Sequence, residues 1–200
     1  MAEAKQMSLS HFVALKSDHA VAQTFWVVTF ALLTAIGAQI EIPHQPVPYT
    51  LQTFFVLLAG GVLGWRNGLL SMSLYVGMGA LGMPVFSGGG FGLVRLLGPS
   101  GGYLLSFPLA AALVGALLSL RPSGSFDTGG AVKRFMAGYG WTLLAMSSGL
   151  VLIFLSGTVQ LYAILMHNWR SAFESGFLIF SGWDLLKLGA AVAIARELRR

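Results

Sequence analysis

Long apolar segments, separated by short stretches that hold most of the charged residues, dominate this sequence. No Asp, Glu, Lys or Arg occurs in residues 19–40, 42–65, 67–94, 96–120 or 135–169. About 20 apolar residues cross the hydrocarbon core of a bilayer, so each segment is long enough to do so. The pattern predicts an all-α integral membrane protein, with residues 1–200 forming one compact bundle. Its six transmembrane helices are expected at about residues 20–41, 50–65, 67–84, 100–120, 137–164 and 173–195.

Proline and glycine mark the predicted connections. Three prolines at positions 43, 46 and 48 predict an extended connection before the second helix, because proline disfavours helix in itself and in the preceding residue. Glycines at positions 88–90 and 92 predict a re-entrant, Gly-rich outer loop between helices three and four. Residues 1–19 contain only a short apolar patch, which predicts a cytoplasmic lead-in rather than a signal peptide.

The basic residues predict the orientation of the bundle, because cytoplasmic loops of membrane proteins carry an excess of Lys and Arg. Two arginines, Arg95 and Arg170, fall on one side of the predicted topology, and Lys187 lies within a helix. The other nine cations fall on the side of both termini, which predicts cytoplasmic termini: Lys5, Lys16, Arg66, Arg121, Lys133, Arg134, Arg196, Arg199 and Arg200.

Composition narrows the class of function. Charged residues make up 10% of the chain, against about 25% in soluble domains, so a soluble globular protein is excluded. The sequence has no cysteine, no Walker motif and no G-x-S-x-G motif, and its four histidines lie far apart. We therefore expect no metal site, no cofactor and no catalytic residue. If the protein takes part in active transport, another subunit must supply the energy.

Asp184 and Lys187 are the only charged residues between Ser175 and Ala195, within the predicted sixth helix. A charge near the middle of a bilayer costs at least about 2.5 to 3.5 kcal/mol, so both side chains must face the protein interior or a cavity. Their i, i+3 spacing places them on one helical face. They can form a structural ion pair, or they can present a carboxylate acceptor and an ammonium donor to a ligand.

Other residues are weaker candidates for a binding site. Gln52 lies within an apolar run, where its amide can bind a ligand or a neighbouring helix. Arg95 is the only Lys or Arg in the Gly-rich loop of the sequence. Its guanidinium can contact lipid phosphate or water, or it can bind the carboxylate of a ligand. Four aromatic residues can wall such a site, although membrane aromatics also serve as interfacial anchors: Phe86, Phe91, Tyr103 and Trp183.

Ala31 and Ala35 form a small-x-x-x-small pair in the predicted first helix. Such pairs let two helices approach closely. The pair can pack within the bundle, or it can form a smooth surface for another membrane protein.

Several motifs, taken together, resemble those of one transporter family. They are Ala-Gln-Ile at 38–40, Pro-Val-Pro-Tyr-Thr-Leu-Gln-Thr-Phe at 46–54, Leu-Leu-Ala-Gly-Gly at 57–61, Gly-Leu-Leu-Ser at 68–71, Gly-Met-Pro-Val-Phe at 82–86, Leu-Gly-Pro-Ser-Gly-Gly-Tyr-Leu at 97–104 and Asp-Leu-Leu-Lys at 184–187. With them the sequence resembles the BioY family, the biotin-specific S components of energy-coupling-factor (ECF) vitamin transporters. The likeness is nearly continuous from the first predicted helix to the fourth.

This resemblance implies a subunit of the prokaryotic plasma membrane that captures biotin from the outer side. It implies that Asp184 and Lys187 bind the ureido group of biotin and that the loop from Ser87 to Gly92 closes over the ligand. Family members often carry a side-chain amide where this sequence has Gly88, so Ser87 or Gln52 is expected to replace one ligand hydrogen bond. Arg95, Phe86 and Tyr103, proposed above from the residues themselves and not from the resemblance, complete the expected site.

The implied partners are a transmembrane coupling protein, contacted through Ala31 and Ala35, and two cytoplasmic ATPase subunits. Two alternatives stay open at this stage. The first is an S component for another small cofactor such as lipoate. The second is a stand-alone facilitator or channel that uses Asp184 and Lys187 as a relay.

Overall fold

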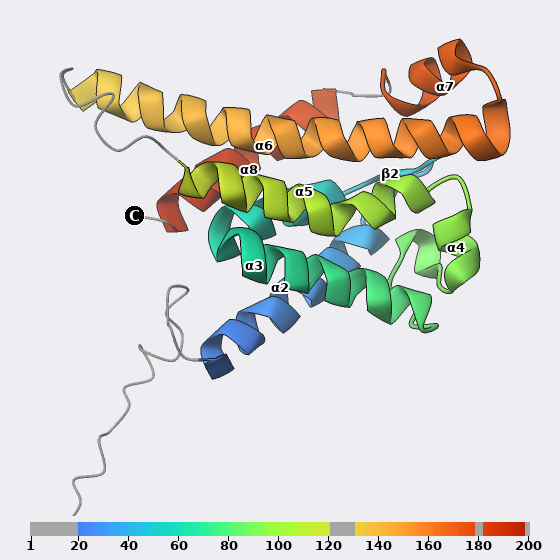
Figure 1. Ribbon diagram of the computed structural model, residues 1–200, viewed down its shortest axis with the longest axis horizontal. Helices are drawn as coiled ribbons and strands as arrows, with labels where there is room; N and C mark the ends of the chain where they lie inside the picture. Colours follow the sequence, from blue (N-terminus) through green and yellow to red (C-terminus); the bar gives the residue numbers. More distant parts are fainter. Residues whose placement is uncertain (1–19, 121–130, 179–181, 199–200) are drawn as a thin grey trace, which may run out of the picture.

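The structure, a computed structural model, describes residues 20–120, 131–178 and 182–198, and for residues 131–138 it describes the backbone alone. The predicted lead-in, residues 1–19, lies outside this range. The described residues are mainly helical (Figure 1). In chain order the elements are α2 (Ala20–Gln39), β1 (Glu41–Ile42), β2 (Tyr49–Thr50), α3 (Gln52–Ala80), η1 (Ser87–Gly89), α4 (Leu93–Leu97), α5 (Gly101–Ser119), α6 (Ala131–Leu161), η2 (Tyr162–Met166), α7 (Trp169–Gly176) and α8 (Gly182–Leu198).

Four helices among the described residues are long and apolar enough to cross a bilayer: Ala20–Gln39, Gln52–Ala80, Gly101–Ser119 and Tyr139–Met166. The prediction of an all-α membrane protein is therefore confirmed. A helix suits this environment because it satisfies its backbone hydrogen bonds within one segment, where lipid offers none. The predicted count of six spans stays a prediction.

Helix α3 consists of two antiparallel halves. At Gly64 the backbone adopts φ +79° and ψ −178°, which breaks the helix and which is a conformation nearly confined to glycine. The side-chain amide of Gln52 donates a hydrogen bond to the hydroxyl of Tyr75. A straight helix would separate residues 23 positions apart by about 35 Å, so the two halves fold back on each other. The reversal at Gly64 lies two residues before Arg66, where the sequence predicts the boundary between helices two and three, and the second half ends at Ala80 rather than Pro84.

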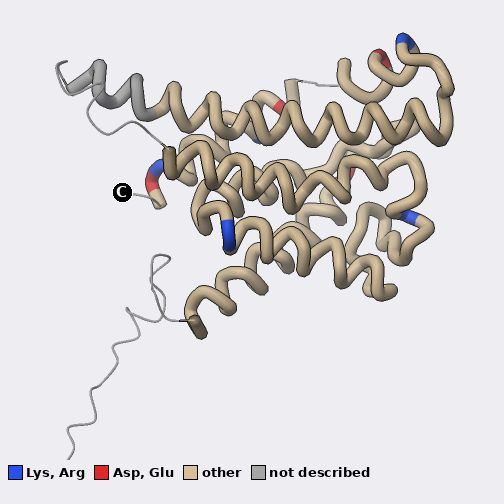
Figure 2. The backbone as a smooth tube through the Cα atoms, in the orientation of Figure 1, with Lys and Arg blue, Asp and Glu red and all other residues tan. Residues whose placement is uncertain are grey.

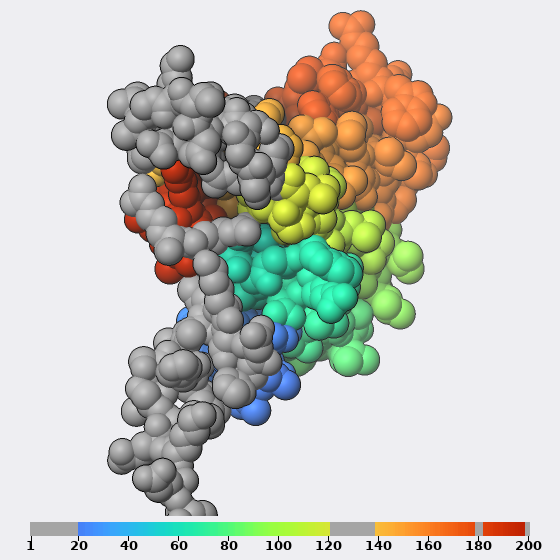
Figure 3. All heavy atoms as spheres, turned by 60° about the vertical axis from the view of Figure 1, so that its left-hand side comes forward, coloured from blue at the N-terminus to red at the C-terminus, as the bar shows by residue number. Residues whose placement is uncertain are grey.

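The helices stack with α3 between α2 and α5, and with α6 on the far side of α5 (Figures 1 and 3). Helix α8 packs against both α3 and α6. Glycine permits the closest of these contacts, because a Cβ atom at Gly60 would collide with the carbonyl group of Ala111 on α5. The core between the helices contains the buried rings of Tyr75 and Phe107, which stack with their centroids 6.3 Å apart.

One end of the bundle carries the β1–β2 hairpin, α4 and α7, and we call it the site end (Figure 1). The hairpin is antiparallel, with Glu41 paired to Thr50, and it confirms the extended connection predicted from the prolines. Most described charges lie at the two ends of the bundle (Figure 2). Arg95 in α4 and Arg170 in α7 belong to the site end, whereas Arg66, beside the α3 reversal, and Arg196, near the end of α8, belong to the other.

The predicted helix over residues 173–195 is wrong at its start. Residues 169–176 form the separate short helix α7, whose first turn is capped by the Asn168 side chain accepting from the N–H groups of Arg170 and Ser171. Helix α8 begins only at Gly182. Asp184 therefore lies in the first turn of its helix and not in the middle of a long one.

The Gly-rich connection between α3 and α5 is folded rather than extended. It contains the η1 turn and the short helix α4. Four of its glycines have positive φ angles, at positions 82, 88, 89 and 92. The side chain of Gln39, at the end of α2, holds this turn by donating to the Phe86 carbonyl at 3.0 Å and accepting from the Gly89 N–H at 3.2 Å.

Candidate ligand-binding site

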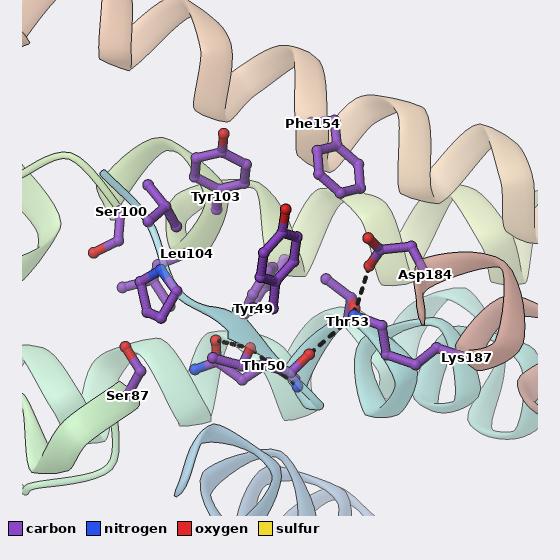
Figure 4. Close-up of a pocket in the computed structure, with 14 residues that line it drawn as sticks. Tyr49, Thr50, Thr53, Ser87, Ser100, Tyr103, Leu104, Phe154, Asp184 and Lys187 are labelled. Atoms are coloured by element: carbon purple, nitrogen blue, oxygen red, sulfur yellow. Dashed lines mark hydrogen bonds and ion pairs between the residues drawn. The ribbon is translucent and has the colours of Figure 1, made fainter. Parts of the chain in front are cut away.

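A pocket opens at the site end, between β2 and the helices α3, α5, α6 and α8 (Figure 4). The space at this pocket, counted together with the open solvent at its mouth, is about 620 Å³. Its lining residues are Val47, Pro48, Tyr49, Thr50, Gln52, Thr53, Ser87, Ser100, Tyr103, Leu104, Phe107, Phe154, Asp184 and Lys187.

Asp184 and Lys187 form a buried ion pair at one side of this pocket. The Lys187 ammonium lies 2.6 Å from Oδ1 of Asp184, and the two side chains are only 6% and 2% exposed, respectively. Lys187 also donates to the Thr50 carbonyl and to Oγ1 of Thr53, each at 3.0 Å. An ammonium group has three N–H donors, so protein groups use all of them. The pair therefore joins α8 to β2 and to the start of α3.

A chain of hydrogen bonds continues from β2 into the core. The Thr50 hydroxyl donates to Oε1 of Gln52 at 2.9 Å, and Nε2 of Gln52 donates to the Tyr75 hydroxyl. Tyr75 in turn donates to the carbonyl of Val85 at 3.1 Å, just before the η1 turn. Gln52 thus lines the pocket, and both ends of its amide bind protein groups. Its role in this structure is to hold β2 against the second half of α3. A contact of Gln52 with a ligand stays a prediction.

Tyr49 covers the pocket from β2 (Figure 4). Burial raises the pKa of the Tyr49 hydroxyl, and the negative charge of Asp184 raises it further. The hydroxyl therefore keeps its proton at neutral pH and stays a hydrogen-bond donor.

The rest of the lining is largely apolar. Tyr103 presents its ring to the pocket, because its hydroxyl donates to the carbonyl of Gly176 in α7 at 2.9 Å. The ring meets Phe154 edge to face, with their centroids 6.1 Å apart. Leu104 and Phe107 extend this surface along α5. Such a wall suits an apolar ring system or chain.

Three residues predicted for the site lie outside the pocket lining. Phe86 is 1% exposed and packs edge to face against Tyr75 in the core. Gly88 is exposed and has φ +62°. Arg95 donates from its guanidinium to the Ser87 carbonyl at 3.0 Å, so it holds the η1 turn rather than facing the cavity. The aromatic residues Phe91 and Trp183 are also outside the lining, and they are 59% and 41% exposed.

The small pair of α2 faces inward. Ala31 is fully buried, and Ala35 is half-buried against the same core. Packing within the bundle is thus the observed role of these residues. The exposed face of α2 consists of large apolar side chains instead: Val21, Phe25, Val28, Leu32 and Ile36.

The sequence analysis missed four polar residues of the pocket lining: Tyr49, Thr50, Thr53 and Ser100. The first three lie in the Pro-Val-Pro-Tyr-Thr-Leu-Gln-Thr-Phe motif at 46–54, and Ser100 lies in the Leu-Gly-Pro-Ser-Gly-Gly-Tyr-Leu motif at 97–104. Both motifs carried part of the family resemblance, so they were usable signals. Thr50 and Thr53 accept hydrogen bonds from Lys187, which lies more than 130 positions later in the chain.

Comparison with known proteins places the chain in a family of transporters. The biotin transporter BioY of Thermotoga maritima is 38% identical over 86% of this chain and 92% of its own length. A probable biotin transporter BioY of Pyrococcus horikoshii is 39% identical over 86% and 93%. The crystal structure of an S-component for biotin from an ECF-type ABC transporter superposes with a TM-score of 0.75. It shares 25% identity and covers 90% of this chain and 91% of its own.

These relatives and the four apolar helices identify a multi-pass membrane protein of a prokaryote. The model of the BioY family matches residues 6–200, nearly the whole sequence. The chain therefore belongs to the BioY family.

Proposed function

We propose that this protein binds biotin as the substrate-binding S component of an ECF-type importer. The observation that carries the proposal is the buried Asp184–Lys187 pair at one side of an otherwise mostly apolar pocket. A ureido group offers two N–H donors and one carbonyl acceptor. A carboxylate has about four acceptor sites, so Asp184 can keep Lys187 and still accept from the ligand. Lys187 exchanges one of its protein acceptors for the ureido carbonyl, and the apolar rings and chain of biotin lie against Tyr103 and Phe107.

The proposed topology has six spans, with the two halves of α3 counted separately and α8 as the sixth. Both termini are cytoplasmic, and the site end faces outward with the Gly-rich loop as a re-entrant segment beside the pocket. The sequence supports this orientation, because cytoplasmic loops carry the larger share of cations. Nine of its Lys and Arg residues fall on the side of Arg66 and Arg196, against two, Arg95 and Arg170, on the side of the site end.

The proposed partners are a transmembrane coupling protein and two cytoplasmic ATPases, since this chain has no nucleotide-binding motif of its own. We place the contact with the coupling protein on the exposed apolar face of α2, from Val21 to Ile36. In this arrangement Ala31 and Ala35 serve the contact indirectly, by seating α2 against α3.

Titration of the purified protein with biotin tests the function. We expect binding at or below micromolar concentration, and at least tenfold weaker binding, about 1.4 kcal/mol, after Asp184→Asn. Competition with lipoate tests the alternative ligand, because stronger binding of lipoate than of biotin refutes the proposal.

Proteoliposomes that contain this chain alone test the second alternative. Rapid biotin flux without ATP and without partner subunits would identify a facilitator. Uptake that needs both ATPases and the coupling protein supports the S-component role.

A further inference from the structure

The short helix α7 follows directly on a membrane span. The apolar helical segment that is long enough to cross a bilayer runs from Tyr139 to Met166, and α7 begins at Trp169. Between them His167 adopts a left-handed conformation, with φ 49° and ψ 16°, where the chain leaves the end of the span. The eight residues of α7 extend about 12 Å, too short to cross a bilayer. Helix α7 packs beside the end of α6 at the site end (Figure 1), which places it near the membrane boundary.

Polar and apolar side chains occupy opposite faces of α7, as the helical period of 3.6 residues arranges them. The polar face carries Arg170 and Glu174, which form an exposed ion pair at 3.0 Å. Ser171 lies on the same face and is also exposed. The opposite face consists of apolar residues: Trp169, Ala172, Phe173 and Gly176. A helix with this division is amphipathic and lies at a boundary between water and an apolar phase.

The protein covers one half of this apolar face. Ala172 and Gly176 are buried. A Cβ atom at Gly176 would lie only 2.7 Å from Oγ1 of Thr158, so this half of α7 is seated tightly on α6. The carbonyl of Gly176 also accepts a hydrogen bond of 2.9 Å from the hydroxyl of Tyr103, which lines the pocket. The position of α7 therefore bears on one wall of the pocket.

The other half of the apolar face is exposed. Trp169 and Phe173 are 56% and 41% exposed, respectively. Each ring stacks on one neighbour, Trp169 on Tyr162 with centroids 3.9 Å apart and Phe173 on Phe177 with centroids 5.0 Å apart. The preceding span also exposes large apolar side chains: Val151, Leu155, Val159, Ile164 and Leu165. Lipid covers the exposed side chains of a span, so the two rings of α7 lie next to the same apolar phase.

We propose that α7 is an interfacial helix that binds the lipid surface and supports the pocket from there. Trp169 and Phe173 insert at the boundary between headgroups and acyl chains, and Arg170 and Glu174 face the headgroups and water. Amphipathic helices with Trp or Phe on the apolar face bind at this boundary, and indole rings are enriched there. The lipid contact keeps α7 seated on α6 and, through the Gly176 carbonyl, steadies the adjacent wall of the pocket.

Depth-dependent quenching of tryptophan fluorescence tests the lipid contact. The purified full-length protein is reconstituted in phosphatidylcholine vesicles whose acyl chains carry bromine either near the headgroup or near the bilayer centre. The chain has five tryptophans, so the difference in emission between the wild-type protein and Trp169→Phe reports Trp169. Bromine near the headgroup should quench this signal at least about twofold more than bromine at the centre, because interfacial side chains lie only about 5 to 10 Å deep. Equal quenching at both depths overturns the proposal. Quenching at neither depth also overturns it, since protein would then cover this face.

Three variants, each measured against its own Trp169→Phe derivative, separate lipid contact from contacts within the protein. Phe173→Asp places a charge on the proposed lipid face and should lower headgroup-level quenching of Trp169 at least about twofold. Phe173→Leu removes the ring stack with Phe177 but keeps an apolar side chain, so it should retain the quenching. Ser171→Asp places the same charge on the polar face and should also retain it. Equal losses in Phe173→Asp and Phe173→Leu would show that the ring serves the protein interior, which contradicts the proposal.

The rate of biotin release tests the support of the pocket, and this part rests on the proposed function. In vesicles biotin should dissociate at least about threefold faster from Phe173→Asp than from Phe173→Leu or Ser171→Asp. Equal rates in the three variants overturn the support of the pocket wall by α7. A wild-type protein that binds no biotin refutes the proposed function instead, whereas the quenching of Trp169 does not depend on any ligand.

Discussion

Lys187→Met is the change that most directly tests the ion pair, because methionine keeps the length of the side chain and removes its charge. The ammonium of Lys187 binds Asp184, the Thr50 carbonyl and the Thr53 hydroxyl in the ligand-free protein. Its loss leaves the Asp184 carboxylate, which is only 2% exposed, without its counter-charge. Removal of one partner from a buried pair typically costs about 3 to 5 kcal/mol.

This cost can be read from thermal unfolding of the detergent-solubilised protein. For a chain of this size each kcal/mol lowers the unfolding temperature by about 2 to 4 °C, so we expect a decrease of about 6 to 20 °C. The matched control is the Asp184→Asn/Lys187→Met double variant. It has no uncompensated charge, and it should recover at least half of the lost stability.

Biotin binding separates the structural role of the pair from its binding role. Stability should return in the double variant, but affinity should stay at least about tenfold below the wild-type value, since the double variant offers neither carboxylate nor ammonium to the ureido group. The reasoning fails if Lys187→Met unfolds within about 2 °C of the wild-type protein. It also fails if the double variant binds biotin normally.

Three further changes test the fold around the site. Tyr75→Phe leaves a buried amide donor without its acceptor and should lower the unfolding free energy by about 1 to 3 kcal/mol; an unchanged chemical denaturation midpoint would argue against the hydrogen-bond chain. Gly64→Ala should lower the unfolding free energy by about 1 to 3 kcal/mol through backbone strain, because a Cβ atom there meets no neighbouring atom. The control is Gly77→Ala, where a Cβ atom also meets no neighbouring atom, and it should leave the unfolding free energy unchanged or raise it. Equal effects of the two changes would contradict the reversal at Gly64. Ala31→Trp should destabilise the protein by about 1 to 3 kcal/mol or more, because Ala31 is fully buried. Leu32→Trp, on the exposed face of α2, should leave the stability nearly unchanged. A larger loss of stability from Leu32→Trp than from Ala31→Trp would mean that the face with Ala31 does not point into the bundle.

The hydrophobic pattern predicted most of the fold because lipid allows few backbone solutions. The helix expected at 100–120 is observed as Gly101–Ser119, and the break between residues 65 and 67 is observed at Gly64. The hydrophobic pattern did not predict the break between α7 and α8, because both helices contain apolar residues. Hydropathy also carries no information about the residue that caps a helix. Asn168 was the local signal for that cap.

Candidate site residues could be predicted from the sequence where a charged side chain lies in an otherwise apolar segment. Asp184 and Lys187 stand out because charges in apolar segments require partners. Thr50 and Thr53 do not stand out, because a threonine near a turn is common and its use depends on a distant lysine. Ala31 was ambiguous for another reason: small residues allow close packing, but sequence alone does not say which helix approaches.

The contact between Lys187 and Thr50 spans 137 positions, and this separation affects how the protein is made. During synthesis the segment around Thr50 leaves the ribosome well before the segment around Lys187. The pocket can therefore be completed only when the last helix has joined the bundle. Because a ligand stabilises only the state that binds it, biotin favours the fully assembled chain over one whose carboxyl-terminal helix has not yet docked.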